Sequence, residues 1–218
     1  MKYNKKLLNN ALLSLGLLVL YSLAICFFDV EAIGPNGTEV GFSHINAAFA
    51  SLVPYNATLD KITDVFMLIA ILTALAFAVV GLVQLVKRKS LFKVDNAIIG
   101  LGVVYLVVIV LYVLFDKVAI SYRPVLVPGE EELETSFPSS HVLVIATILT
   151  TAKFAIDKVF PEKTTLRKIV AIVVPVIVLL TVVLRAFAGV HWISDILAGA
   201  LFAIVISNFY YLANYDEH

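Results

Sequence analysis

Residues 97–115 read AIIGLGVVYLVVIVLYVLF, nineteen consecutive residues without a charged side chain. A helix that crosses the hydrocarbon core of a bilayer needs about 20 mostly apolar residues. Five further segments of this kind cover residues 7–28, 62–86, 139–156, 169–187 and 192–213. The sequence therefore predicts an all-α, polytopic membrane protein with six transmembrane helices. Because the connections are short, we expect residues 1–218 to form a single domain.

The composition excludes several other classes of protein. Hydrophobic residues make up 61% of the 218 residues and charged residues only 15%, against about 25% charged residues in an average soluble domain. The single Cys26 excludes an intrachain disulfide scaffold. A net charge of zero gives no basic excess for binding nucleic acid. We therefore expect the lipid bilayer, and no nucleic acid, to be the partner of this chain.

The basic residues predict how the helices are oriented. Twelve of the sixteen Lys and Arg residues lie on one side of the predicted helices, within residues 2–6, 87–93 and 153–168. The positive-inside rule places this side, with both termini, in the cytoplasm of a multi-pass protein of the cell membrane. Lys2 and its neighbours also precede the first segment as in a signal peptide. That alternative is disfavoured because the apolar run is longer than a usual signal-peptide core.

The outward connections contain two further patterns. In the longest of them, residues 29–61, apolar residues recur at helical spacing between 42 and 53, which predicts a short helix on the membrane surface. Glu130, Glu131, Glu132 and Glu134 form an acidic cluster that we interpret as a solvated loop. His44 and His218 are likewise expected to be solvated.

Two groups of polar residues lie at the outward ends of the third and fourth segments, where charged side chains usually have a function. Lys117 and Arg123 follow the third segment and could bind an anion, the alternative being two interfacial anchors. Residues 138–141, Pro-Ser-Ser-His, begin the fourth segment. Proline and serine are typical of a helix start, and its unpaired N–H groups and positive dipole could hold a phosphate.

A third group contains Arg185, His191 and Asp195, around the connection between the fifth and sixth segments. Gly189 lies where the chain must turn. His191 and Asp195 are four residues apart, so we expect them on one face of the sixth helix. Asp195 would then accept a hydrogen bond from one imidazole nitrogen and leave the other free as a nucleophile or base. The alternative is a purely structural His–Asp pair.

Together, the three groups resemble the signatures of the type 2 phosphatidic acid phosphatase (PAP2) superfamily: K-x6-RP, PSGH and SR-x5-H-x3-D. The second signature matches residues 138–141, with Ser140 in place of Gly. The third matches Arg185, His191 and Asp195, with Leu184 in place of the leading Ser. Only five residues separate Lys117 from Arg123. A slip of one residue turns a helical side chain by about 100°, so the role of Lys117 is the least supported.

The resemblance implies a six-helix lipid phosphatase with its site at headgroup depth on the extracytoplasmic side. It implies that His191 attacks phosphorus to form a phosphohistidine, that Asp195 orients His191, and that His141 protonates the leaving oxygen. The implied phosphate-binding residues are Lys117, Arg123, Ser139, Ser140 and Arg185. No metal-binding signature occurs, and no cofactor is expected. Activity in EDTA is therefore predicted, with a bell-shaped pH profile from the two histidines.

The sequence is compatible with several substrates and functions. The candidate lipids are phosphatidate, phosphatidylglycerophosphate and undecaprenyl diphosphate. One alternative function is a lipid phosphotransferase that uses the same phosphohistidine. Vanadate-dependent halide oxidation, also found in this superfamily, is disfavoured by the membrane setting. A non-catalytic lipid-headgroup binding or transport protein is disfavoured because binding an anion needs cations rather than two histidines.

Overall fold

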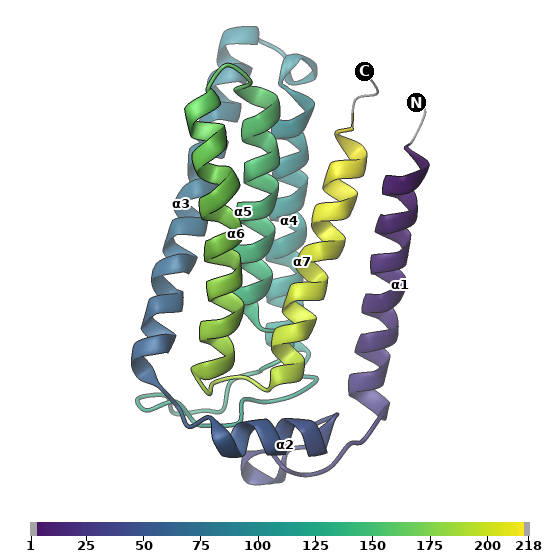
Figure 1. The fold of residues 1–218 in the computed structure, drawn as a ribbon, viewed down its shortest axis with the longest axis vertical. Coiled ribbons are helices and arrows are strands. Elements are labelled where there is room, and N and C mark those ends of the chain that lie inside the picture. The colour runs from purple at the N-terminus through teal and green to yellow at the C-terminus, as the bar shows by residue number, and fades with distance from the viewer. Residues whose placement is uncertain (1–3, 216–218) are drawn as a thin grey trace.

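The computed structural model describes residues 4–215, so Lys2 and His218 lie outside the described part. Its secondary structure is helical apart from two isolated β-bridges. The helices are α1 (Lys5–Phe27), α2 (Ser43–Leu52), α3 (Ala57–Arg88), α4 (Asn96–Lys117), α5 (Ser140–Val159), α6 (Thr164–Phe187) and α7 (Ile193–Ala213) (Figure 1). Two short 3-10 helices, η1 (Pro35–Gly37) and η2 (Leu91–Lys93), lie in the connections.

Each of the six predicted apolar segments folds into a helix. Five of the described helices, α1, α3, α4, α6 and α7, are long and apolar enough to cross a membrane. The remaining segment forms α5, which packs against α3, α4, α6 and α7 and carries Lys153 and Asp157 near its end. The all-helical architecture is thus confirmed, while the sixth crossing, by α5, stays a prediction.

The core of the bundle forms around α5. Eleven residues of this helix are buried, and they are contributed by several of its faces rather than by one stripe. The outer faces of the surrounding helices are apolar, with side chains such as Leu13, Leu20 and Ile172 more than 60% exposed. A contiguous apolar surface of this extent is not stable in water. It is the surface expected of a protein embedded in lipid.

α3 extends beyond its predicted limits at its N-terminal end. It was expected over 62–86, but it begins five residues earlier, at Ala57, where Asn56 provides the cap. The Asn56 side-chain oxygen accepts hydrogen bonds from the backbone N–H groups of Thr58 and Leu59, each at 3.1 Å. Such a cap stabilises a helix by about 1 kcal/mol. The added turn brings Asp60 into α3.

α1 stands apart from the rest of the bundle. Among the described helices it packs against α7 alone (Figure 1). Two side-chain hydrogen bonds join them: Asn208 Nδ2 donates to Ser14 Oγ at 3.1 Å, and Tyr21 Oη donates to the carbonyl oxygen of Ser194 at 3.0 Å. α1 therefore depends on α7 for its place in the structure.

The connections divide between the two ends of the bundle. Figure 1 shows the termini, the α3–α4 connection and the α5–α6 connection at one end, and α2 and the α6–α7 turn at the other. The described basic segments at 5–6, 87–93 and 153–168 thus share one end, as the charge pattern predicts. Their location in the cytoplasm stays a prediction.

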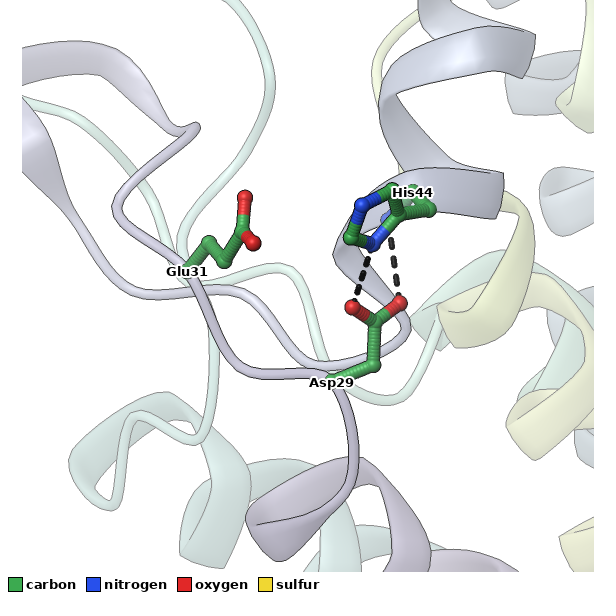
Figure 2. A group of neighbouring side chains, drawn as sticks. All are labelled: Asp29, Glu31 and His44. Atoms are coloured by element: carbon green, nitrogen blue, oxygen red, sulfur yellow. Dashed lines mark hydrogen bonds and ion pairs between the residues drawn. The ribbon is translucent and has the colours of Figure 1, made fainter.

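α2 lies across the opposite end of the bundle, where helical spacing predicted a surface helix (Figure 1). Asp29 caps it: its carboxylate accepts from Ser43 Oγ at 2.9 Å. It also accepts from the backbone N–H of His44 at 3.0 Å (Figure 2). Hydrogen bonding to Asp29 also raises the pKa of His44. Glu31 lies beside this pair. Capping of α2 and the ion pair with His44 account for the position of the Asp29 carboxylate.

Candidate active site

The three polar groups identified in the sequence meet at the end of the bundle that carries α2. The backbone N–H of Ser139 donates to the carbonyl oxygen of Asp195 at 2.9 Å, which joins the start of α5 to α7. Gly199 permits this approach, because a Cβ there would lie 2.8 Å from the Ser139 carbonyl oxygen. A cavity of about 380 Å³ opens beside this junction, and its lining includes Lys117, Arg123, Ser140 and His191.

The segment between α4 and α5 doubles back on itself and carries site residues on both arms. Tyr122 and Thr135 form an isolated antiparallel bridge. The backbone N–H of Arg123 donates to the carbonyl of Glu134 at 3.0 Å, and that of Ser136 donates to the carbonyl of Ser121 at 2.9 Å. This pairing holds Ser121 and Ser136 side by side, close in the chain to Arg123, which lines the cavity.

Arg123 lines the cavity together with His191. Its side chain is 16% exposed, and one terminal nitrogen lies 2.5 Å from Oε2 of Glu134. Its Nε is buried without a hydrogen-bond partner among the described residues. The acidic cluster is therefore not only a solvated loop, because Glu134 holds the guanidinium in place. The free Nε leaves Arg123 with capacity to bind a further acceptor.

His191 is a buried and neutral imidazole. The residue is 4% exposed, and Nδ1 lies 3.0 Å from Ser136 Oγ. Burial, reinforced by the positive charges of Arg185 and Arg123, holds the pKa of His191 well below its usual range. Nε2 is buried without a partner among the described residues. A neutral imidazole with one nitrogen held and the other free is the form that a nucleophile requires.

Asp195 does not pair directly with His191, which corrects the expectation from their spacing. In the described part of the chain, Ser136 is the hydrogen-bond partner of His191 Nδ1. Asp195 is fully buried and accepts from Ser121 Oγ at 3.3 Å, and it also interacts with the Ser136 side chain. The spacing rule fails because α7 begins at Ile193, so His191 lies in the turn before the helix. Ser136 therefore lies between the imidazole and the carboxylate.

His141 has a partner that sequence analysis missed. Its Nε2 lies 2.9 Å from Oδ1 of Asp64 on α3, and its side chain is 16% exposed. The other ring nitrogen, Nδ1, is buried without a partner among the described residues. His141 thus repeats the pattern of His191, with one ring nitrogen held and the other free.

Arg185 is the most deeply buried cation of the site. Its side chain is 1% exposed and is paired with Asp60 of α3, while a terminal nitrogen donates to Thr63 Oγ1 at 3.2 Å. Its Nε has no partner among the described residues. A buried guanidinium is costly unless it is paired, so Asp60 accounts for the stability of Arg185 in the absence of a ligand.

Lys117 departs from the other cations, as the shortened first signature suggested. It is the last residue of α4, its side chain is 77% exposed, and Nζ lies 2.9 Å from Oδ2 of Asp116. It does line the same cavity as Arg123. The structure therefore places Lys117 at the rim of the cavity. Arg123 and Arg185, in contrast, lie close enough to His191 for their positive charges to lower its pKa.

The start of α5 contributes hydrogen-bond donors to the site. Ser139 is fully buried, and its Oγ has no partner among the described residues. Ser140 is the first residue of α5 and lines the cavity. The backbone N–H groups of a first helical turn have no partners within the helix, and they favour an anion at this position.

The α6–α7 turn depends on Gly189, as its position predicted. Gly189 has a φ of +70°, which a residue with a side chain rarely adopts. A Cβ would also lie 2.8 Å from the backbone carbonyl of Pro54, in the connection between α2 and α3. This close approach brings residues 53–55 against the turn that carries His191.

Sequence reasoning missed Asp60, Asp64 and Ser136. Asp60 and Asp64 did leave a signal, since they are two carboxylates one turn apart at the end of an otherwise apolar helix. Ser136 left none, because a serine near a proline is typical of any helix start.

Comparison with known proteins identifies the family of this chain. The family model described as the PAP2 superfamily matches residues 97–218, more than half of the chain. The chain belongs to the PAP2 superfamily. The matched region contains both histidines and all three cations of the site, whereas α1, α2 and α3 precede it.

A curated protein and a solved structure, both from Bacillus subtilis, are similar to this chain. Phosphatidylglycerophosphatase B of strain 168 is 30% identical over 95 residues, which are 44% of this chain and 46% of that protein. The alignment therefore spans about half the length of that relative. A crystal structure of a transmembrane PAP2-type phosphatidylglycerolphosphate phosphatase matches with a TM-score of 0.60 and 19% identity, over 92% of this chain and 94% of the other. That similarity supports the PAP2 fold for the whole bundle.

Proposed function

We propose that this protein hydrolyses the phosphate ester of a membrane lipid through a phosphohistidine. The cavity carries this proposal, because its lining combines two kinds of side chain. Arg123, Ser140 and His191 are polar or charged, and Leu111 and Phe115 of α4 are apolar. A lipid phosphate has the matching division between a charged head and an apolar tail.

The first chemical step assigns one role to each histidine. The free Nε2 of His191 attacks phosphorus and forms the P–N bond, while the bond between phosphorus and the leaving oxygen breaks. His141 gives its proton to that oxygen, which leaves as an alcohol. Arg123 and Arg185, with the first turn of α5 and Ser139, stabilise the charge on the other phosphoryl oxygens.

The second step returns the site to its starting state. Water attacks phosphorus, His141 accepts a proton from it, and the P–N bond breaks to release inorganic phosphate. Ser136 and Asp195 act on Nδ1 of His191 in both steps. An Nδ1–H that donates to Ser136 fixes the tautomer in which Nε2 keeps its lone pair.

The relative's name suggests the first substrate to try. Phosphatidylglycerophosphate is a lipid phosphate monoester, and the resemblance also admits phosphatidate and undecaprenyl diphosphate. The proposal further holds that residues 1–218 form one domain with six crossings. The basic end then faces the cytoplasm and the site faces outward.

Phosphate release in detergent with EDTA tests this function. We expect the purified protein to release inorganic phosphate from phosphatidylglycerophosphate at an undiminished rate in EDTA. Arg123, Arg185 and the start of α5 supply the positive charge that a metal ion supplies elsewhere. Phosphatidate and undecaprenyl diphosphate are assayed in parallel, and their relative kcat/KM values identify the preferred lipid.

Two results would contradict the proposal. Loss of activity in EDTA that added Mg²⁺ restores would show that a metal takes part. Phosphate release that requires an added lipid alcohol as acceptor would instead identify a phosphotransferase.

Ser136 provides a second test, aimed at the nucleophile. The Ser136→Ala variant removes the group between His191 Nδ1 and Asp195, and one hydrogen bond stabilises by about 0.5–1.5 kcal/mol. We expect kcat to fall by about 3–10-fold with little change in KM. Ser207→Ala is the matched control, because Ser207 is a buried serine near the other end of α7. Equal kinetics for both variants would remove Ser136 from the mechanism.

A further inference from the structure

Two carboxylates of α3, in the first half of the chain, pair with two motif residues of the second half, Arg185 and His141. Asp60 and Asp64 lie one helical turn apart, so they share a face of α3. Asp60 pairs with Arg185, and Asp64 Oδ1 lies 2.9 Å from Nε2 of His141. α3 also packs against both α5 and α6, which carry these partners.

We propose that Asp64 is a positioning residue for His141, and that the two form a carboxylate–imidazole pair in which Nδ1 transfers the proton. This inference rests on the proposed function, in which His141 protonates the leaving oxygen. Asp64 accepts the Nε2–H and thereby fixes the ring. Nδ1 is then the ring nitrogen that can transfer a proton, and it has no hydrogen-bond partner among the described residues.

Burial and the charges around His141 explain why such a partner is needed. Burial disfavours the protonated ring and Arg185 of α6 adds a repelling positive charge, whereas Asp64 and Asp60 of α3 act in the opposite direction with attracting negative charge. His191, in the α6–α7 turn, is a further titratable group that interacts electrostatically with His141. A protonated imidazole beside a buried guanidinium is unfavourable unless an anion offsets the repulsion. Asp64 is the only one of these anions in hydrogen-bond contact with the His141 ring in the described structure.

Exposure suits Asp64 to this task. Its side chain is 61% exposed, against 16% for His141, so water hydrates the carboxylate. The pair therefore has a hydrated anion on one side and a buried, free Nδ1 on the other. The proton that leaves Nδ1 goes to the leaving oxygen, and a proton from the attacking water later replaces it.

Leaving-group dependence separates this role from a structural one. Asp64→Asn keeps the shape of the side chain and removes its charge. For a lipid phosphate, whose alkoxide needs a proton, we expect kcat to fall by about 10–10²-fold with KM within about twofold. For p-nitrophenyl phosphate, whose leaving group departs without a proton, we expect kcat within about threefold. Asp64→Glu, which restores the carboxylate, should recover part of the lost rate.

The pH profile gives an independent readout. Without the carboxylate, His141 loses its proton at lower pH, so the basic limb of the kcat profile for the lipid should move down by about one pH unit. Asp157→Asn is the matched control, because Asp157 is an ion-paired aspartate at the other end of α5. That variant should keep the wild-type rate and profile.

Three outcomes would overturn the assignment. The first is an Asp64→Asn variant with wild-type kinetics. The second is an equal loss of activity toward the lipid phosphate and p-nitrophenyl phosphate. The third is a gain of activity, which would show that Asp64 competes with phosphate. Thermal unfolding in detergent identifies a misfolded variant, and Asp64→Glu then serves in its place. If the wild-type protein hydrolyses no phosphate ester, the proposed function itself has failed. The Asp64–His141 pair is then tested by NMR of protein labelled at the histidine ring nitrogens. The pH at which His141 titrates must differ between the wild-type protein and Asp64→Asn.

Discussion

Replacing His191 with asparagine is expected to reduce phosphate release by on the order of 10⁴-fold or more, since the reaction then has no nucleophile. His191 is buried, neutral and free at Nε2, and the other histidine of the site is held by a different helix. Asparagine retains a polar group that can face Ser136, so we expect the fold to persist. Initial rates with the preferred lipid and thermal unfolding in detergent measure the two effects separately.

The matched control is His44→Asn at the same end of the molecule. His44 is an exposed histidine that pairs with Asp29, so its variant should keep wild-type activity. A covalent intermediate gives a direct check, because a phosphohistidine survives an alkaline quench. Label on wild-type protein and on His44→Asn, but not on His191→Asn, is the expected pattern. Turnover that persists in His191→Asn would mean that another residue attacks phosphorus.

The second large effect is expected at Arg185. Arg185→Gln should lower kcat/KM by about 10²–10³-fold, the loss typical when one group that stabilises transition-state charge is removed. It should also destabilise the fold by up to about 3 kcal/mol, because Asp60 is left without its partner. Steady-state kinetics and the midpoint of thermal unfolding report these losses.

A double variant separates the two losses. Adding Asp60→Asn to Arg185→Gln removes the unpaired carboxylate, so stability should return while activity does not. Arg88→Gln is the control, since Arg88 pairs with Asp95 near the other end of α3, where both side chains are well exposed. Activity that recovers in the double variant would show that Arg185 serves the fold rather than the phosphate.

The sequence allowed the helices to be predicted but not all of their surroundings. Apolar runs marked all six long helices, because a helix in lipid or in a helical core needs apolar side chains on most faces. They did not distinguish α5, which is surrounded by four other helices, from the helices that face lipid. An apolar run shows that a helix avoids water, whereas tertiary packing decides whether that helix contacts lipid or other helices.

The site shows the same limit more sharply. Signature spacing identified Arg123, His141 and Arg185, since those patterns are local. The partners Asp64 and Asp60 lie 77 and 125 residues away along the chain, and no local rule connects them. The His191–Asp195 expectation failed for a related reason: helical spacing was applied across the start of α7. Lys117 and Arg123, one residue too close, did end in different environments.

The packing of α1 against α7 has a consequence for how the protein is made. A chain is synthesised from its N-terminus, so α1 enters the bilayer well before its packing partner exists. α7 then brings Asp195 and places His191 just ahead of it, so one event both secures α1 and completes the candidate site. A polypeptide interrupted before residue 193 would lack the packing partner of α1 and two residues of that site. The proposed activity is thereby tied to the synthesis of α7.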